Sequence, residues 1–295
     1  MKLGVVFPQT EIGSDPAAIR DFAQAVESLG FHHLLVYDHV LGADAANRPG
    51  WLAYTIEDAF HEPFVLFGFL AAVTTRLELA TGVIILPQRQ TALVAKQAAE
   101  VDVLSRGRLR LGVGLGWNSV EYEALGMEFG NRGARVAEQV RLMRALWTEE
   151  RVTFRGRWHT VVEAGIRPMP VQRPIPVWMG GADDRALRRA ARLADGWMYG
   201  GGLPNPFTRA PARRPRELVE RLRAFAGAAG RAPATLGIEG RVSVTQGTPD
   251  DWRKAAEEWQ ALGATHLSVA TMRAGFATPD AHVEAVRRFR EALSA

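Results

Sequence analysis

The sequence has no cysteine among its 295 residues. Disulfide bridges, thiolate nucleophiles, and zinc or iron–sulfur sites with cysteine ligands are therefore excluded. A chain without disulfides is typical of a reducing compartment, and we expect the protein to be cytoplasmic.

Long apolar runs are missing as well. The N-terminal apolar stretch, residues 3–7, is too short for the hydrophobic part of a secretion signal, and Pro8 ends it. No run approaches the roughly 18 apolar residues that a membrane-spanning helix needs. We therefore expect an intracellular protein without a membrane partner.

Lysine is scarce, because nearly all of the 36 basic residues are arginine; the formal net charge is +4. The arginines alternate with acidic residues in segments such as 217–223 and 284–291, which is typical of solvated helix faces. We therefore expect no nucleic-acid partner. The densest arginine group, at positions 209–216, is either a solvated loop or a contact for an anionic ligand tail.

Short apolar runs alternate with amphipathic helical patterns along the whole chain. Eight strand–helix units predict a parallel sheet that closes on itself, so the fold class is α/β, a (β/α)8 TIM barrel, with residues 1–295 as one domain. A doubly wound open sheet is the alternative, but residues 8–13 lack the glycine-rich dinucleotide fingerprint. The expected strands are residues 3–7, 33–37, 77–85, 108–114, 175–180, 196–199, 236–244 and 266–270.

Two connections are long, residues 40–62 after the second strand and 151–173 before the fifth. Long loops on barrels are usually functional, and we expect insertions at the C-terminal face. Residues 154–159 are typical of a hairpin. Trp51 and Tyr54 in the first connection favour a loop that closes over an apolar or aromatic substrate.

Active sites of such barrels lie at the C-terminal ends of the strands. The second strand ends at Asp38 and His39, and a histidine there is suited to act as general acid or base. Asp38 would orient it or bind a ligand; the alternative is a structural histidine satisfied by a neighbour. With His61 and Glu62 these residues do not form a recognisable metal-ligand spacing, so no metal site is expected.

Glycines follow several other strand ends. Gly112, Gly114 and Gly116, at alternate positions, leave the backbone open along one face, and Trp117 and Asn118 follow as a stacking surface and a hydrogen-bonding group.

A glycine turn follows the fifth predicted strand. Gly180, Gly181 and Ala182 precede a predicted helix, and backbone amides at such a turn form an anion site. After the third strand, Gly82 either allows close approach of a flat ligand or forms a simple bulge.

Taken together, these strand ends resemble the luciferase-like monooxygenase superfamily, and within it the branch of coenzyme F-420-dependent oxidoreductases. The resemblance covers essentially the whole chain. It implies a barrel that holds a flavin or deazaflavin ring at its C-terminal mouth, and a homodimer. The segments that carry it are residues 1–9, 37–39, 79–87, 108–126, 174–181 and 186–197.

The resemblance also implies roles for the matched residues. His39 is the acid or base beside the ring, with Asp38 near the cofactor. Gly82 and Val83 form a cis peptide bond that supports the back face of the ring. The full set of predicted cofactor-binding residues is Thr81, Gly82, Val83, Gly114, Gly116, Trp117, Asn118, Gly180, Gly181, Ala182, Trp197 and Met198.

In one place the sequence departs from the family pattern. Sugar-phosphate dehydrogenases of the F-420 branch carry a glutamate proton donor in the strand-four segment, where this chain has residues 114–117, Gly-Leu-Gly-Trp. This difference argues against a sugar-phosphate substrate and against a Glu–His pair.

We therefore expect hydride transfer between F-420 and a small organic substrate, with His39 moving the accompanying proton. One alternative is a monooxygenase that uses reduced FMN and oxygen and depends on a flavin reductase. A second alternative is a non-catalytic barrel that only binds a flavin. A metal-dependent hydrolase or lyase would need a stoichiometric metal ion.

Overall fold

Eight parallel strands close into a barrel in the computed structural model, which describes residues 1–46, 48, 51, 54–200 and 213–294. They are β1 (Lys2–Val6), β2 (His33–Val36), β3 (Glu78–Thr81), β5 (Leu109–Gly114), β8 (Val177–Gly180), β9 (Gly196–Met198), β10 (Gly237–Ser243) and β11 (His266–Ala270). β1 pairs with β2 and β11, and the pairing of β3 with β5 completes the ring. The predicted (β/α)8 barrel is therefore confirmed.

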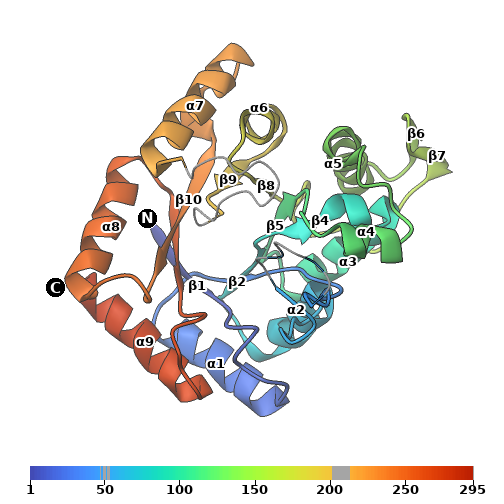
Figure 1. Ribbon diagram of the computed structural model, residues 1–295. Helices are drawn as coiled ribbons and strands as arrows, with labels where there is room; N and C mark the ends of the chain where they lie inside the picture. Colours follow the sequence, from blue (N-terminus) through green and yellow to red (C-terminus); the bar gives the residue numbers. More distant parts are fainter. Residues whose placement is uncertain (47, 49–50, 52–53, 201–212, 295) are drawn as a thin grey trace.

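Helices surround the strands, and Figure 1 shows the first and the last of them side by side. They are α1 (Pro16–Ser28), α2 (Pro63–Val73), α3 (Thr91–Leu104), α4 (Ser119–Ala124), α5 (Arg132–Thr148), α6 (Asp184–Leu193), α7 (Pro215–Ala228), α8 (Pro249–Ala261) and α9 (Pro279–Ala292), with 3-10 turns η1 (Leu86–Gln88) and η2 (Pro233–Thr235). The start of α1 follows from its sequence: the Asp15 side chain accepts from the Ala17 amide at 3.0 Å, and Pro16 opens the first turn.

The segment predicted as one strand over residues 77–85 is two short strands. β3 ends at Thr81, and β4 (Ile84–Ile85) continues along β5 after an interruption. The peptide bond between Gly82 and Val83, at the interruption, is cis, as the resemblance implies.

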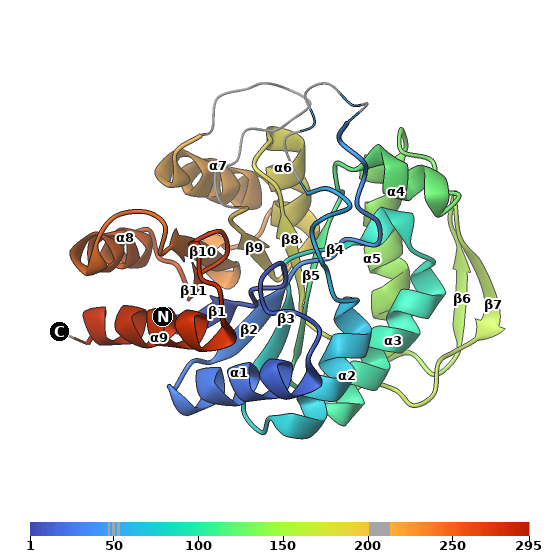
Figure 2. The ribbon, with the colours of Figure 1, turned by 60° about the horizontal axis from the view of Figure 1, so that its bottom comes forward.

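The insertion before β8 folds along the outside of the barrel, and its tip reaches the N-terminus of α3, where His159 Nε2 lies 2.7 Å from the Thr91 hydroxyl. The predicted hairpin is present as the antiparallel pair β6 (Val152–Arg155) and β7 (Thr160–Ala164). It lies outside α5 (Figure 2), where the carboxylate of Glu138 accepts from the amides of residues 157–159.

The inside of the barrel is polar in its N-terminal half. Glu239, Arg110 and His33 are buried there: Glu239 Oε2 accepts from Arg110 Nη1 at 2.5 Å, and Oε1 lies 3.0 Å from His33 Nε2. Above this layer is an apolar group, here called the floor cluster. It comprises the buried residues Val6, Leu35, Trp178, Met198 and Met272, with Tyr37, Tyr54, Val83 and Ala270 partly buried against them. The C-terminal mouth therefore opens above an apolar floor.

None of the helices among the described residues is both long and apolar enough to cross a membrane.

Candidate active site

His39 lies at the C-terminal mouth, just after β2, with 11% of its side chain exposed. Its ring is within 5.1 Å of the Tyr54 ring, 4.7 Å of Phe60 and 5.6 Å of Trp117, measured between centroids. The imidazole is therefore held in an aromatic surround with limited access to water. This is the position expected for a proton-transferring group.

Glu121 on α4 binds His39. Its Oε1 lies 3.2 Å from His39 Nδ1 and accepts from the backbone amides of Val40 at 2.8 Å and Leu41 at 3.2 Å. The Glu121 side chain is 1% exposed, so it fixes both the histidine ring and the start of the loop that follows. The sequence argument against a Glu–His pair is wrong, because the glutamate comes from α4 and not from the segment at residues 114–117.

The Asp38 carboxylate is bound by Arg89 and by a backbone amide. Arg89 donates to both of its carboxylate oxygens, Nη2 to Oδ1 at 2.6 Å and Nε to Oδ2 at 3.1 Å, and the Ile85 amide donates to Oδ2 at 2.9 Å. Asp38 is 2% exposed. Its carboxylate thus ties β2 to the segment after β4, and the orienting role considered for Asp38 falls to Glu121.

The interruption between β3 and β4 places the Val83 side chain against two glycines. A Cβ atom at Gly114 would lie 2.4 Å from Val83 Cγ2, and one at Gly180 would lie 3.3 Å from Val83 Cγ1. Thr81 is buried, and its hydroxyl donates to the Gly112 carbonyl at 2.7 Å. Val83 therefore forms the projecting surface, while Thr81 holds the strands below it together.

The glycines at the end of β5 and just after it do not leave an open backbone face, contrary to the prediction. A Cβ at Gly112 would meet the Thr81 carbonyl oxygen at 2.0 Å, and one at Gly116, where φ is +67°, would meet Ile85 Cγ2 at 2.5 Å. Together with Gly114, they are needed because other parts of the chain occupy the space beside them. These glycines allow the segment that carries Val83 to pack closely on β5.

Asn118 and Trp117 differ in their surroundings. Asn118 is buried, its Oδ1 accepts from the Val120 amide at 3.0 Å to cap α4, and its Nδ2 donates to the Leu41 carbonyl at 3.0 Å. Both polar groups of Asn118 are thus used within the protein. Trp117 is half-buried and its ring meets those of His39 and Trp51, which places Trp117 at the mouth.

The turn before α6 has the features of an anion site. Gly181 has φ of +123° and is exposed together with Ala182, and the Trp197 indole donates to the Gly181 carbonyl at 2.8 Å. Asp183 caps the helix by accepting from the Ala186 amide at 2.8 Å. Trp197 itself is fully buried, so it supports the turn from below.

Arg189, which the sequence analysis missed, lines a small cavity with Gly114 and Gly180 beside this turn. Burial lowers the pKa of its guanidinium, and the charge of Asp183 opposes that change. Among the described residues no carboxylate forms an ion pair with it.

Asp184, at the first turn of α6, is neutralised by arginines. Hydrogen bonds from Arg221 and Arg213 lower its pKa to about 2. An anion at the turn therefore faces no uncompensated carboxylate from this residue. Of the arginine group at 209–216, Arg209 lies outside the described residues, and Arg213 is engaged with Asp184.

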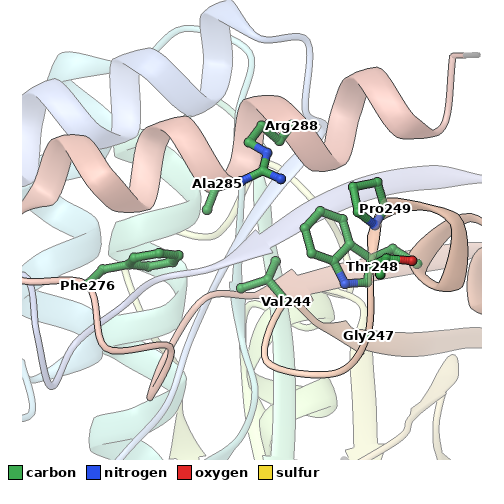
Figure 3. Close-up of a pocket in the computed structure, with 8 residues that line it drawn as sticks. Val244, Gly247, Thr248, Pro249, Phe276, Ala285 and Arg288 are labelled. Carbon is green, nitrogen blue, oxygen red and sulfur yellow. The ribbon is translucent and has the colours of Figure 1, made fainter.

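Two further features are not part of the aromatic surround of His39: the side chain of Met198 and a pocket near α9. Met198 is part of the floor cluster and is 2% exposed. Figure 3 shows a pocket lined by Val244 after β10, Phe276 after β11, and Ala285 and Arg288 of α9. Its volume is about 330 Å³. None of the predicted site residues lines it.

In the described part of the chain, no cluster of His, Asp or Glu is suited to hold a metal ion.

The profile of the luciferase-like monooxygenase family matches residues 1–294. An uncharacterized protein of Mycobacterium tuberculosis is 45% identical over 168 residues, which cover 57% of this chain and 56% of that protein. An F420-dependent glucose-6-phosphate dehydrogenase of Segniliparus rotundus is 33% identical over 195 residues, which cover 64% of this chain and 54% of that enzyme. The chain thus spans about half the length of the curated relatives it matches.

A solved structure with the same fold is that of a monooxygenase from Streptomyces bottropensis. It superposes with a TM-score of 0.78 over 100% of this chain and 99% of its own, at 22% sequence identity. At this identity the likeness concerns the fold.

Proposed function

The chain belongs to the luciferase-like monooxygenase family, and on that premise we propose that it is an oxidoreductase that transfers hydride between coenzyme F-420 and a small organic substrate. The observation that carries the proposal is the His39–Glu121 pair at the mouth of the barrel. The similarity to an F420-dependent dehydrogenase over 195 residues favours the deazaflavin.

The residues present fit a flat ring with a phosphate-bearing side chain. Val83, backed by Gly114 and Gly180, would support the ring. The exposed amides of Gly181 and Ala182, before the N-terminus of α6, would hold the phosphate, and Arg189 would add a positive charge beside them. When bound, the deazaflavin supplies the centre that gives or takes the hydride.

His39 would move the proton that accompanies the hydride. Nδ1 is directed to Glu121, so Nε2 is the nitrogen left for the substrate oxygen. The Glu121 carboxylate keeps the imidazole ring in one orientation. The surrounding rings of Tyr54, Phe60 and Trp117 limit water access, so the proton passes between His39 and substrate.

The second candidate is a monooxygenase that uses reduced FMN and oxygen with a partner flavin reductase. The fold likeness to a monooxygenase favours it, and the same turn and projection would serve FMN. We also propose a homodimer, which the family resemblance implies and which light scattering in solution tests.

Titration of the apo protein with F-420 and with FMN, side by side, separates these candidates. We expect micromolar or tighter binding of F-420, followed by absorbance and fluorescence, and much weaker binding of FMN. Tighter binding of FMN than of F-420 would favour the monooxygenase, whose activity would then be assayed with a flavin reductase and oxygen. Tight binding without turnover across a broad substrate panel would favour a non-catalytic carrier.

Replacing Arg189 with methionine should weaken cofactor binding by roughly tenfold or more, because a charge-assisted hydrogen bond to phosphate is lost. Methionine keeps much of the apolar length of the side chain. The matched control is Arg192→Met, an exposed arginine in the last turn of the same helix, which should leave the dissociation constant unchanged. Equal affinities of wild type and Arg189→Met would remove Arg189 from the phosphate site.

A further inference from the structure

Arg241 on β10 lies inside the mouth of the barrel. It follows Glu239 at the alternate position that faces inward, and it pairs in register with Ser268 of β11. Its Nη1 donates to the Tyr37 hydroxyl at 2.8 Å, and its guanidinium carbon is 5.3 Å from the centroid of the Tyr37 ring. Because β1 and β11 separate β10 from β2 in the barrel, this hydrogen bond crosses the barrel interior.

The positive charge of Arg241 is not matched by an acid. Its Nε is buried and has no hydrogen-bond partner. The neighbouring carboxylate of Glu239 is fully used by Arg110, His33 and Ser268. Over the residues that the structure describes, no carboxylate forms an ion pair with Arg241. A buried, unpaired donor on a cation is costly unless a ligand satisfies it.

This cation is close to the proton-transferring histidine. Tyr37 and Tyr54 belong to the same floor cluster as Val83, and the Tyr54 ring also contacts His39. Burial raises the pKa of Tyr54 to about 12, and the charges of Arg273 and Arg241 act against that rise. Tyr37 and Tyr54 therefore connect Arg241 with both His39 and Val83.

The cofactor phosphate has a separate place. The turn at Gly181 and Ala182 follows β8 and lies at the N-terminus of α6, outside the ring of strands, and Arg189 is on that side. Arg241 instead points across the lumen toward β2. The two cationic positions therefore suit two different anionic groups.

We propose that Arg241 binds the anionic group of the substrate, and that the substrate is an organic acid whose carboxylate meets Arg241 while its apolar body lies among the aromatic side chains around His39. The proposal rests on the proposed function for the location of the reaction. A guanidinium fork matches the two oxygens of a carboxylate. Tyr54, Phe60 and Trp117 match an apolar or aromatic body.

The experiment uses three probes with the same ring: phenylacetate, phenyl phosphate and the neutral phenylacetamide. Each is titrated by ligand-observed NMR into F-420-loaded protein, wild type and Arg241→Met. We expect the wild type to bind phenylacetate at least about tenfold more tightly than phenylacetamide, since hydrogen bonds to charged groups are strong. Arg241→Met should lower phenylacetate binding to the level of the amide. Arg241→Lys should restore part of the preference.

The control is Arg253→Met, a half-exposed arginine on α8 that pairs with Asp250, and it should behave like wild type. Equal binding of phenylacetate and phenylacetamide to the wild type would overturn the proposal, as would an Arg241→Met protein that keeps the preference. If phenyl phosphate binds more tightly than phenylacetate, the anionic group of the substrate is a phosphate ester and the proposed carboxylate is wrong. Loss of F-420 affinity in Arg241→Met would assign Arg241 to the cofactor.

The experiment distinguishes failure of the proposed F-420 dependence from failure of the proposal for Arg241. If F-420 does not bind the wild type, the probes are titrated into FMN-loaded or apo protein, and the dependence on Arg241 is read in the same way. A thermal melt of each variant shows that the fold is retained. A second variant, Tyr37→Phe, removes the hydroxyl but keeps the charge, and it should retain the preference for the carboxylate.

Discussion

Replacing His39 with glutamine should lower turnover by about 10²–10⁴-fold, the range that a positioned acid or base contributes. Glutamine keeps a polar group of similar size but cannot carry the proton. Since His39 makes no contact with the turn at Gly181 or with Arg189, cofactor affinity should fall much less than turnover does. The rate is measured with cofactor-loaded protein and the fastest substrate of a panel of small alcohols and carbonyl compounds.

Two further variants make this test specific. His32→Gln changes an exposed histidine at the opposite end of the same strand and should leave the rate unchanged. Glu121→Gln keeps an oxygen for the amides of Val40 and Leu41 but removes the negative charge from His39. It should lower kcat less than His39→Gln does and leave KM nearly unchanged, because Glu121 acts through the histidine as a positioning residue. Unchanged turnover in His39→Gln with normal cofactor affinity would remove the histidine from the mechanism.

The barrel was predictable because each of its signals is local. Alternating apolar runs and capped amphipathic helices, such as the one that begins at Asp15 and Pro16, are short-range features of the sequence. The break at Gly82–Val83 was invisible to the apolar pattern, since residues 77–85 read as one continuous strand. The hairpin at 152–164 was recognised, but a sequence does not state the end of a barrel at which an insertion packs.

The candidate site was only partly predictable, because its decisive contacts are non-local. The rule that catalytic residues follow barrel strands identified His39. Its partner Glu121 is 82 positions away, and Asp38 is bound by Arg89 at a separation of 51. Gly112, Gly114 and Gly116 were recognised as unusual, but the absence of a side chain does not reveal which residue occupies the space. At Gly114 that residue is Val83.

A second substitution with a large expected effect changes a residue at the other end of the barrel, in the buried polar layer. Glu239→Gln should destabilise the fold by about 3 kcal/mol, the lower end of the range for breaking a buried ion pair, because Arg110 keeps Glu78 as its other partner. The charge that loses a partner is that of Arg110, whose side chain is 3% exposed and whose Nε still pairs with Glu78 Oε1 at 2.7 Å. Burial alone would raise the pKa of Glu239, but Arg110 and His33 hold it well below its usual range. The carboxylate is therefore ionised at neutral pH, and its contribution to stability falls only when acid protonates it.

Urea unfolding at neutral pH, followed by circular dichroism, measures this cost. Glu257→Gln, an exposed glutamate on α8, is the matched control and should change stability by less than about 0.5 kcal/mol. The double variant Glu239→Gln with Arg110→Met removes both buried charges, so it should be more stable than Glu239→Gln alone. A single variant as stable as the control would mean that the polar layer carries no net electrostatic stabilisation. Cofactor affinity should be the same in all folded variants, because the floor cluster separates this layer from the mouth.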